Sequence, residues 1–329
     1  MKAIKILTMA ALATAVFASC SNDEDLAQSN YPMDNVVRIM TSVDGMNTRA
    51  SYGNSTDKLK SFGFCIKNAN SEKYTYDNIM VSQEGSNWIP ATQMLWQNST
   101  TAVDILAYAP YQETTEDANG KVKVFGKTDY AFSVKEDQSN AEDYSSDLIV
   151  YKQTGFKPES DLNTNQAVNV AFTHLLSQLN LTIELRDQFN QDEKKPVTSA
   201  TVTDVKVDGT FIRSKVNFAA DPISVRFDGR ASKAITPETV AFTKADKTTD
   251  HATFKYSAIV IPQRVYAGQL CIKFKVDGTD YIWTGTDDAL FESGKKYELH
   301  LLVGKDVVQG GAITAKPWGE ETIIEKETD

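Results

Sequence analysis

The chain has few of the residues from which disulfide scaffolds, metal sites and nucleic-acid surfaces are built. Its 329 residues include 3 cysteines and 3 histidines, and 34 Lys and Arg stand against 44 Asp and Glu. Cys65 and Cys271 lie in strand-like runs, which favours buried free thiols, although their sequence separation leaves a bond between them open. The acidic balance argues against nucleic acid, because binding it requires clustered positive charge.

The sequence also has none of the common catalytic motifs: no Gly-x-Ser-x-Gly elbow, no P-loop and no glycine-rich dinucleotide turn. His174, His251 and His300 are isolated along the chain, without a second ligand at metal-binding spacing, and His174 lies in an apolar run typical of a core histidine. We therefore expect no catalytic residues, no metal and no cofactor. A sandwich hydrolase with paired carboxylates is the remaining enzymatic alternative.

The first twenty residues have the pattern of a bacterial lipoprotein leader. A short positive segment precedes an apolar run from Ile6 to Phe17, which has the length of a signal-peptide core and is too short to span a bilayer. Small residues come directly before Cys20, and polar sequence follows it. This predicts a signal peptide over residues 1–19, with cleavage before Cys20 and acylation of that cysteine. The alternative is an ordinary secretory signal with a free cysteine nearby.

The rest of the chain alternates apolar and polar residues with a period of two, which indicates strands. Ser61–Ile66 is one such run, and Lys273–Val276 continues beyond Asp277-Gly278 as another. Asp208-Gly209 and Asn119-Gly120 likewise have the residues of tight hairpins. Ala171–Leu185 is the nearest candidate for a helix, and it reads equally well as a turn leading into a strand. Short strands with frequent turns predict an all-β protein made of sandwiches.

The polar stretch from Lys152 to Gln166 is the best candidate for a domain boundary. It predicts an N-terminal domain over residues 20–165 and a C-terminal domain over 166–329 that ends in a strand and a tail. Within the first domain, residues 20–49 comprise a polar tether, a strand over Val36–Val43 and a loop that contains Arg49. A loop of this composition is an ordinary connection in most proteins, and also a place where a protease can reach the chain.

Several segments, taken in order, resemble the fimbrillin family of Bacteroidetes surface pili. They are Met94-Leu95-Trp96, Val103–Tyr111, Asp137-Gln138, Ser146–Ile149, Val170–Leu179, Ile259–Gln263, Gly294–Leu299 and Lys316-Pro317-Trp318. The acidic run Asp23–Asp25 also resembles the sorting signal that carries lipoproteins of this phylum to the outer face of the outer membrane. The resemblance covers nearly the whole chain after the leader.

This resemblance implies two tandem β-sandwiches of Greek-key, transthyretin-like type and a structural subunit of a cell-surface fimbria that contributes to adhesion. It also implies proteolytic cleavage between Arg49 and Ala50, after which a strand from another subunit replaces the lost first strand. The partners would be other fimbrial subunits, the outer membrane through a lipid anchor before processing, and host or bacterial surface ligands. The alternative function is a monomeric surface lipoprotein that binds glycan or host protein. A stalk, tip or anchor position within the fimbria stays open.

Overall fold

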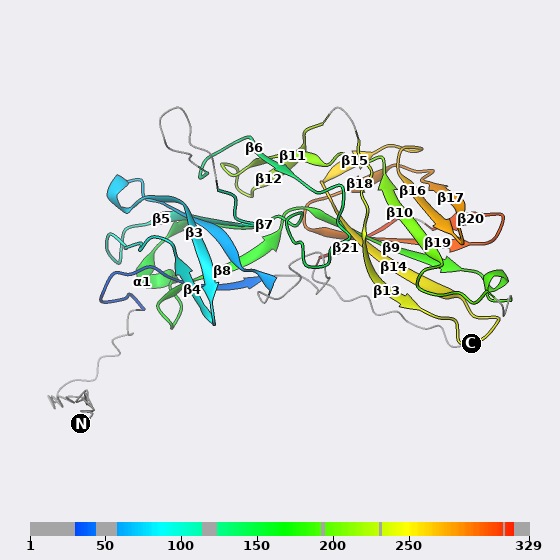
Figure 1. The fold of residues 1–329 in the computed structure, drawn as a ribbon. Coiled ribbons are helices and arrows are strands. Elements are labelled where there is room, and N and C mark those ends of the chain that lie inside the picture. The colour runs from blue at the N-terminus through cyan, green and yellow to red at the C-terminus, as the bar shows by residue number, and fades with distance from the viewer. Residues whose placement is uncertain are drawn as a thin grey trace, which may run out of the picture.

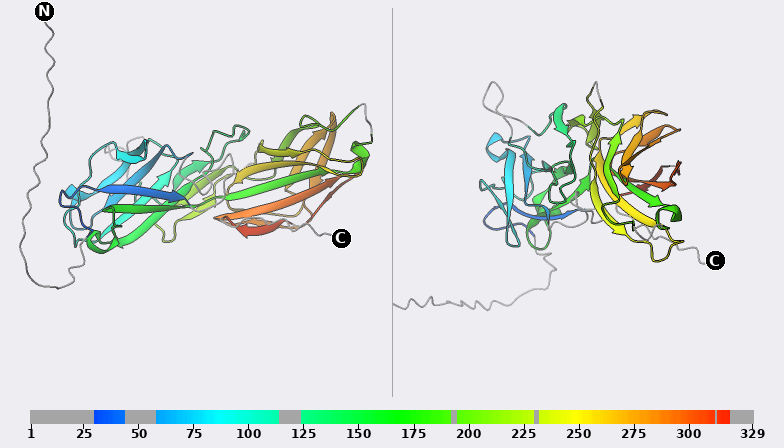
Figure 2. Two further views of the ribbon diagram at one scale, coloured as in Figure 1. Left: turned by 90° about the horizontal axis from the view of Figure 1, so that it is seen from below. Right: turned by 45° about the vertical axis from the view of Figure 1, so that its right-hand side comes forward.

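The computed structural model describes residues 30–43, 58–113, 124–191, 195–229, 232–311 and 313–318. Its regular structure is nearly all strand, as predicted, and Figure 1 shows the strands gathered into two groups along the molecule. In the same part of the chain, no helix is long and apolar enough to cross a membrane. The view from below in Figure 2 shows an elongated body with the early strands at one end and the late strands at the other.

A seven-stranded sheet forms the N-terminal end, in the order β1-β8-β7-β5-β2-β3-β4. Its strands are β1 (Arg38–Val43), β2 (Ser61–Lys67), β3 (Tyr76–Glu84), β4 (Asn87–Pro90), β5 (Val103–Ala109), β7 (Ile149–Phe156) and β8 (Ala167–His174). The short helix α1 (Pro158–Asp161) connects β7 to β8. The sheet curls on itself, so that Phe62 of β2 and Phe172 of β8 meet edge to face with ring centroids 5.3 Å apart.

The central strands of this sheet are buried on both faces. In β2 the run Phe62–Ile66 is buried throughout. Phe62, Phe64 and Ile66 face the core enclosed by the curl, as the predicted alternation requires. Cys65, on the opposite face, belongs to a second and larger core. The sequence pattern therefore identified the strand and one of its faces, but the second buried face depends on other parts of the chain.

The C-terminal end holds a large sheet in the order β13-β14-β9-β19-β20, with β21 also paired to β19, and the smaller sheets β10-β16-β17 and β15-β18. The large sheet contains β9 (Ser177–Leu185), β13 (Glu238–Thr243), β14 (Ala252–Val260), β19 (Lys295–Val303), β20 (Val308–Gly310) and β21 (Thr314–Pro317). The smaller sheets contain β10 (Val202–Asp208), β16 (Cys271–Val276), β17 (Thr279–Thr284), β15 (Gln263–Val265) and β18 (Ala289–Phe291). Strand β9 alternates from Leu179 onward, which buries Leu179, Leu181 and Ile183 between the sheets. Ala171–Leu185 is thus strand and turn, without a helix.

A third sheet links the two ends. It has the order β12-β11-β6, formed by β6 (Tyr130–Ser133), β11 (Arg213–Asn217) and β12 (Ser224–Phe227). Tyr130 and Phe218 pack their rings on Tyr108 of β5, at centroid distances of 5.7 and 5.6 Å. The ammonium group of Lys152 in β7 donates to the carbonyls of Phe218, Ala219 and Ala220. One continuous core therefore joins the two ends.

Strand pairing crosses the proposed domain boundary, which lies between residues 165 and 166. Strand β8 lies after the boundary and pairs with β1 and β7, which precede it. Strand β6 precedes the boundary and pairs with β11, which lies after it. The division into two domains stays a prediction, and the boundary stretch itself contains the end of β7 and all of α1.

The hairpins predicted at the two Asp-Gly pairs differ in outcome: one forms and the other does not. Asp277-Gly278 joins β16 and β17 in a two-residue hairpin, with φ angles of 51° and 84° and with Val276 opposite Thr279. At Asp208-Gly209 the hairpin prediction is wrong, because β10 pairs with β16 whereas β11 pairs with β6 and β12. Gly209 still adopts a positive φ of 94° there. Asn119-Gly120 lies outside the described residues.

The C-terminal segment lies along the start of β19. Residues Thr314–Pro317 of β21 pair with Lys295–Glu298, and Pro317 is part of this pairing. It occupies the last position of a short strand, where a missing N–H is tolerated. Trp318 follows, buried and stacked on the His174 ring at a centroid distance of 3.9 Å. The segment is therefore fixed at its end onto the last residue of β8.

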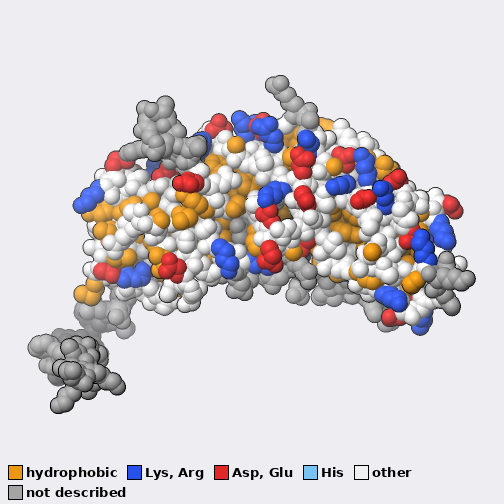
Figure 3. All heavy atoms as spheres, viewed as in Figure 1, with side chains coloured by type: hydrophobic (Ala, Val, Ile, Leu, Met, Phe, Trp, Pro, Cys, Tyr) orange, Lys and Arg blue, Asp and Glu red, His pale blue; other side chains and the backbone are white. Residues whose placement is uncertain are grey.

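Charges of both signs are mixed on the surface. On the face that Figure 3 shows, Lys and Arg side chains alternate with Asp and Glu, most densely over the C-terminal end. Ion pairs on the protein surface include Lys273 with Asp208 at 2.6 Å and Lys275 with Asp204 at 3.1 Å. This face therefore offers no continuous basic surface of the kind that nucleic acid requires.

Candidate functional site

Strand β1 is attached to its sheet along one side. It runs parallel to β8, with pairs from Arg38 opposite Ala167 to Val43 opposite Phe172. Its other edge faces β4, and in the described part of the chain it is joined there at its start, where Val36 bridges to Leu95. Loss of β1 and the residues before it would therefore break one parallel ladder and this bridge, and would leave the order of the other six strands intact.

The alternation of β1 matches the core beneath it. The inward side chains of Val37 and Ile39 are only 2% and 6% exposed. The side chain of Met40, on the other face of the strand, is 43% exposed. On β8, the partners of the inward residues include Val168 and Val170, which are fully buried. The position occupied by β1 thus requires an extended segment with apolar residues at every second position.

An ion pair holds the entry into β1. The Arg38 guanidinium donates two hydrogen bonds to the Asp34 carboxylate, at 3.1 and 2.6 Å. These bonds, together with one from the Val36 N–H, lower the pKa of Asp34. Arg38 lies inside the strand, as the sequence predicted. Its side chain is bound to Asp34, and its backbone is paired with β8 opposite Ala167.

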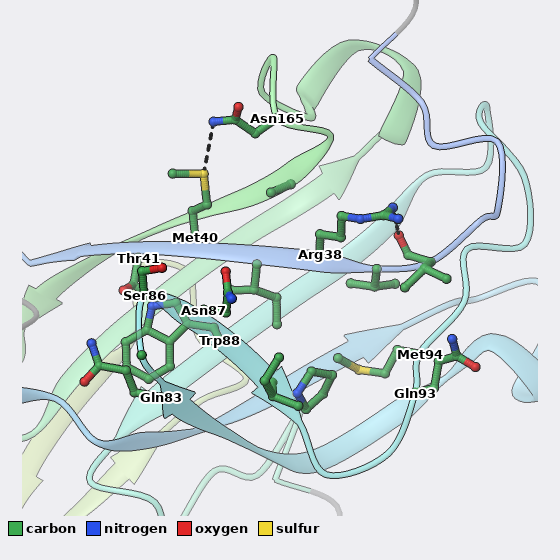
Figure 4. A pocket seen from close by; sticks show the side chains of 17 residues that line it. Arg38, Met40, Thr41, Gln83, Ser86, Asn87, Trp88, Gln93, Met94 and Asn165 are labelled. Atoms are coloured by element: carbon green, nitrogen blue, oxygen red, sulfur yellow. Dashed lines mark hydrogen bonds between the residues drawn. The ribbon is translucent and has the colours of Figure 1, made fainter. Parts of the chain in front are cut away.

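A groove lies between β1 and the hairpin of β3 and β4, and Figure 4 shows it from close by. Its volume is about 1070 Å³. We call it the β1–β4 groove. One wall is Val36–Thr41, and the opposite wall includes Gln83, Asn87, Trp88 and Gln93. The Trp88 ring packs edge to face on the ring of Phe62 in the core, with 5.1 Å between the ring centroids. This contact fixes the orientation of the Trp88 ring.

The predicted modification sites Cys20, Arg49 and Ala50 lie outside the described residues, and lipidation and cleavage stay predictions. The structure shows that β1 ends at Val43, six positions before Arg49. The predicted strand over Val36–Val43 is confirmed, with Val36 present as a single bridge and the ladder beginning at Arg38.

The histidines are only partly as expected. His174 is a buried core residue, as predicted, and its Nδ1 lies 2.9 Å from an Asp147 oxygen. His251 and His300 are not isolated: both contact Glu184, His251 through Nδ1 and His300 through Nε2 at 2.7 Å. This contact could not be predicted from the sequence, because it depends on β14, β9 and β19 lying side by side in the sheet. Within the described residues, no three His, Cys, Asp or Glu side chains are placed to hold a metal ion.

Both cysteines of the described part are free, as expected. Cys65 is buried, and burial followed by the nearby Asp77 carboxylate raises the pKa of its thiol well above the usual value. Cys271 is only half-buried, which differs from the expectation of burial. Among the tryptophans, Trp96 stacks on Phe156 in the core at 5.6 Å, and Trp318 is buried as described above.

Solved structures with the same fold include proteins from several Bacteroides species. A candidate cell adhesion protein from Bacteroides uniformis is 20% identical, with a TM-score of 0.55 over 87% of this chain and 99% of its own. A second such protein, from Bacteroides ovatus, is 13% identical with a TM-score of 0.61 over 87% and 98%. A fimbrial protein from Bacteroides vulgatus is 17% identical with a TM-score of 0.51 over 86% and 99%. Among curated proteins, none matches this chain.

The chain therefore shares its all-β fold with these bacterial proteins, and its own first strand lies at the edge of a sheet. The fimbrillin-like family model matches residues 48–318, and the chain belongs to this family. Membership confirms the resemblance noted in the sequence and supports a role as a fimbrial subunit at the cell surface. The family is one of structural subunits.

Proposed function

We propose that the protein is a structural subunit of a cell-surface fimbria that is exported as a lipoprotein and assembled by strand exchange after proteolysis. The observation that carries this proposal is the attachment of β1 by one parallel ladder at the edge of its sheet. The chain continues from β1 directly into the segment that contains Arg49. Hydrolysis of the Arg49–Ala50 bond would separate β1 from the rest of the protein without cutting any other strand.

Departure of β1 creates the driving force for assembly. It uncovers Val168, Val170 and Phe172, which are fully buried, and exposing apolar surface costs about 25 cal/mol for each Å². It also leaves the N–H and C=O groups on one edge of β8 without partners. A strand from another subunit satisfies both requirements when its apolar residues alternate. Such a head-to-tail contact does not close on itself and propagates as a filament.

The C-terminal segment is our candidate for the donated strand. Strands β20 and β21 are short, lie at the edge of their sheet and consist mostly of exposed residues. The C-terminal segment has few apolar side chains, among them Ile313, which is half-buried, and Trp318, which is buried. Donation by this segment suits a stalk subunit, whereas a tip subunit needs only to accept a strand.

Lipidation is tested by Cys20→Ala. In cells supplied with a tagged fatty acid, we expect the wild-type protein to carry the label and the variant to carry none, because Cys20 alone provides the acyl acceptor at the predicted cleavage site. The unprocessed precursor should accumulate or leak from the cells. Cys271→Ala serves as the control, since that thiol lies in the folded C-terminal end. Unchanged label on Cys20→Ala would rule out the lipoprotein assignment and its anchoring in the outer membrane.

The assembly mechanism is tested on protein recovered from the cell surface. We expect the N-terminal residue of assembled fibres to be Ala50, and electron microscopy to show filaments after treatment with an arginine-specific protease but not before. An intact acylated Cys20 within assembled fibres would contradict the mechanism. A monomeric lipoprotein that binds glycan or host protein is the second candidate function, and the β1–β4 groove is the observation that favours it.

A further inference from the structure

We propose that the β1–β4 groove binds a neutral oligosaccharide. Val36–Thr41 form one wall of the groove, so the inference concerns the subunit before cleavage at Arg49 and does not rest on strand exchange. It deepens the second candidate function, the glycan-binding lipoprotein. It depends on the kind of side chains that line the groove, on which of them lack partners, and on the fixed position of one aromatic ring.

The lining of the groove is almost free of charge. Of its 17 residues, one is charged, although charged residues make up 24% of the chain. That residue is Arg38, and its guanidinium is engaged by Asp34 through two hydrogen bonds. A charged ligand would therefore find no free counter-charge here. The lining suits a ligand that is polar and neutral.

Amide side chains supply the polar part of the lining. The amide groups of Gln83, Asn87 and Gln93 make no hydrogen bond to other residues in the part of the chain that the structure describes, so only solvent competes with a ligand for them. Asn165 points its NH₂ group at the Met40 sulfur, 3.3 Å away, and a thioether is a weak acceptor. Each amide offers one acceptor oxygen and two donor hydrogens. Adjacent sugar hydroxyls, which both donate and accept, can satisfy such groups.

Trp88 supplies an apolar surface beside these amides. Its ring is half-buried and held edge to face against Phe62. Figure 4 shows it between β1 and the β3–β4 hairpin, with Gln83 and Asn87 close by. An aromatic ring fixed in this way can pack against the C–H face of a sugar at little cost in side-chain entropy. An aromatic surface flanked by a few polar groups is the usual composition of a small-ligand site.

A peptide strand is the competing occupant. It would pair with the backbone edges of β1 and β4 and would leave the amides of Asn87 and Gln93 unused. At the start of β1 that edge is already closed by the bridge from Val36 to Leu95. The side chains of the groove therefore favour a sugar over a strand.

The test uses the purified full chain and a panel of neutral oligosaccharides, with uronic-acid oligosaccharides as charged counterparts. We expect at least one neutral oligosaccharide to bind and the charged ones not to bind. Titration calorimetry then gives the affinity for each variant. Asn87→Ala and Gln93→Ala are exposed positions that leave the core intact, and each should weaken binding by about ten-fold, as expected for one lost polar contact. Trp88→Phe should weaken it while keeping the contact with Phe62.

Two controls place the ligand in the groove. Met40→Ala changes the β1 wall and should also weaken binding, whereas Asn70→Ala removes an exposed amide outside the groove and should have no effect. Failure of the folded chain to bind any neutral oligosaccharide would overturn the proposal. So would binding that Asn87→Ala, Gln93→Ala and Trp88→Phe leave unchanged. A synthetic peptide of residues 308–318 that enters the groove in place of the sugars would identify a strand site instead. None of these results depends on cleavage at Arg49 or on filament formation.

Discussion

Replacing Gly63 with alanine is expected to lower the free energy of unfolding by about 3 kcal/mol, at the upper end of the cost of overpacking a core. A Cβ atom at this position in β2 would lie 2.3 Å from Cε1 of Tyr108 and 2.8 Å from Oδ1 of Asn78. Tyr108 cannot move away easily. Its hydroxyl donates to that same Asn78 oxygen at 2.7 Å, and its ring packs on Tyr130 and Phe218.

Urea denaturation of the full chain measures this effect, with Gly311→Ala as the matched control. No heavy atom lies within 4 Å of a Cβ built at Gly311, so this second substitution should change the stability by no more than about 0.5 kcal/mol. Tyr108 belongs to the core that joins the two ends of the molecule. We therefore expect Gly63→Ala to destabilise both ends of the molecule together. A denaturation midpoint equal to that of the wild type would show that the Tyr108 ring is free to shift.

Replacing Arg49 with glutamine is expected to abolish filaments. An arginine-specific protease recognises the guanidinium of the residue before the cleaved bond, so the variant should keep its first strand. With β1 in place, the edge of β8 stays paired and Val168 and Phe172 stay covered. The site on β8 that would accept a strand from another subunit then does not form. Electron microscopy of fibres sheared from cells and sequencing of the N-terminus measure the result.

Arg38→Gln is the matched control for this experiment. Arg38 is the other basic residue between Cys20 and Arg49, and it lies in a strand that is paired along its length. A protease binds an extended, accessible segment, so Arg38 is not expected to be a cleavage site. Its replacement should leave processing at Arg49 intact. Filaments of normal length from Arg49→Gln, with those from Arg38→Gln unchanged, would contradict the proposed mechanism.

Local sequence signals predicted individual strands well and their partners poorly. The alternation in β2 and the two-residue hairpin at Asp277-Gly278 were correct, because each depends on neighbouring residues alone. The hairpin expected at Asp208-Gly209 was not, because β10 finds a better partner in β16, more than sixty residues further along the chain. A turn signal sets the local backbone, whereas the choice of partner depends on packing across the whole domain.

The same distinction holds for the candidate sites. The sequence by itself determined the all-β class, the family and the position of the first strand, since periodicity and ordered motifs are properties of the linear chain. Only the tertiary structure decided that β1 lies on β8, that His251 and His300 meet at Glu184, and that a neutral groove separates β1 from β4. These features join residues that are far apart in sequence. Alternation specifies which face of a strand is buried, but the neighbours of that strand are selected by contacts formed when the chain folds.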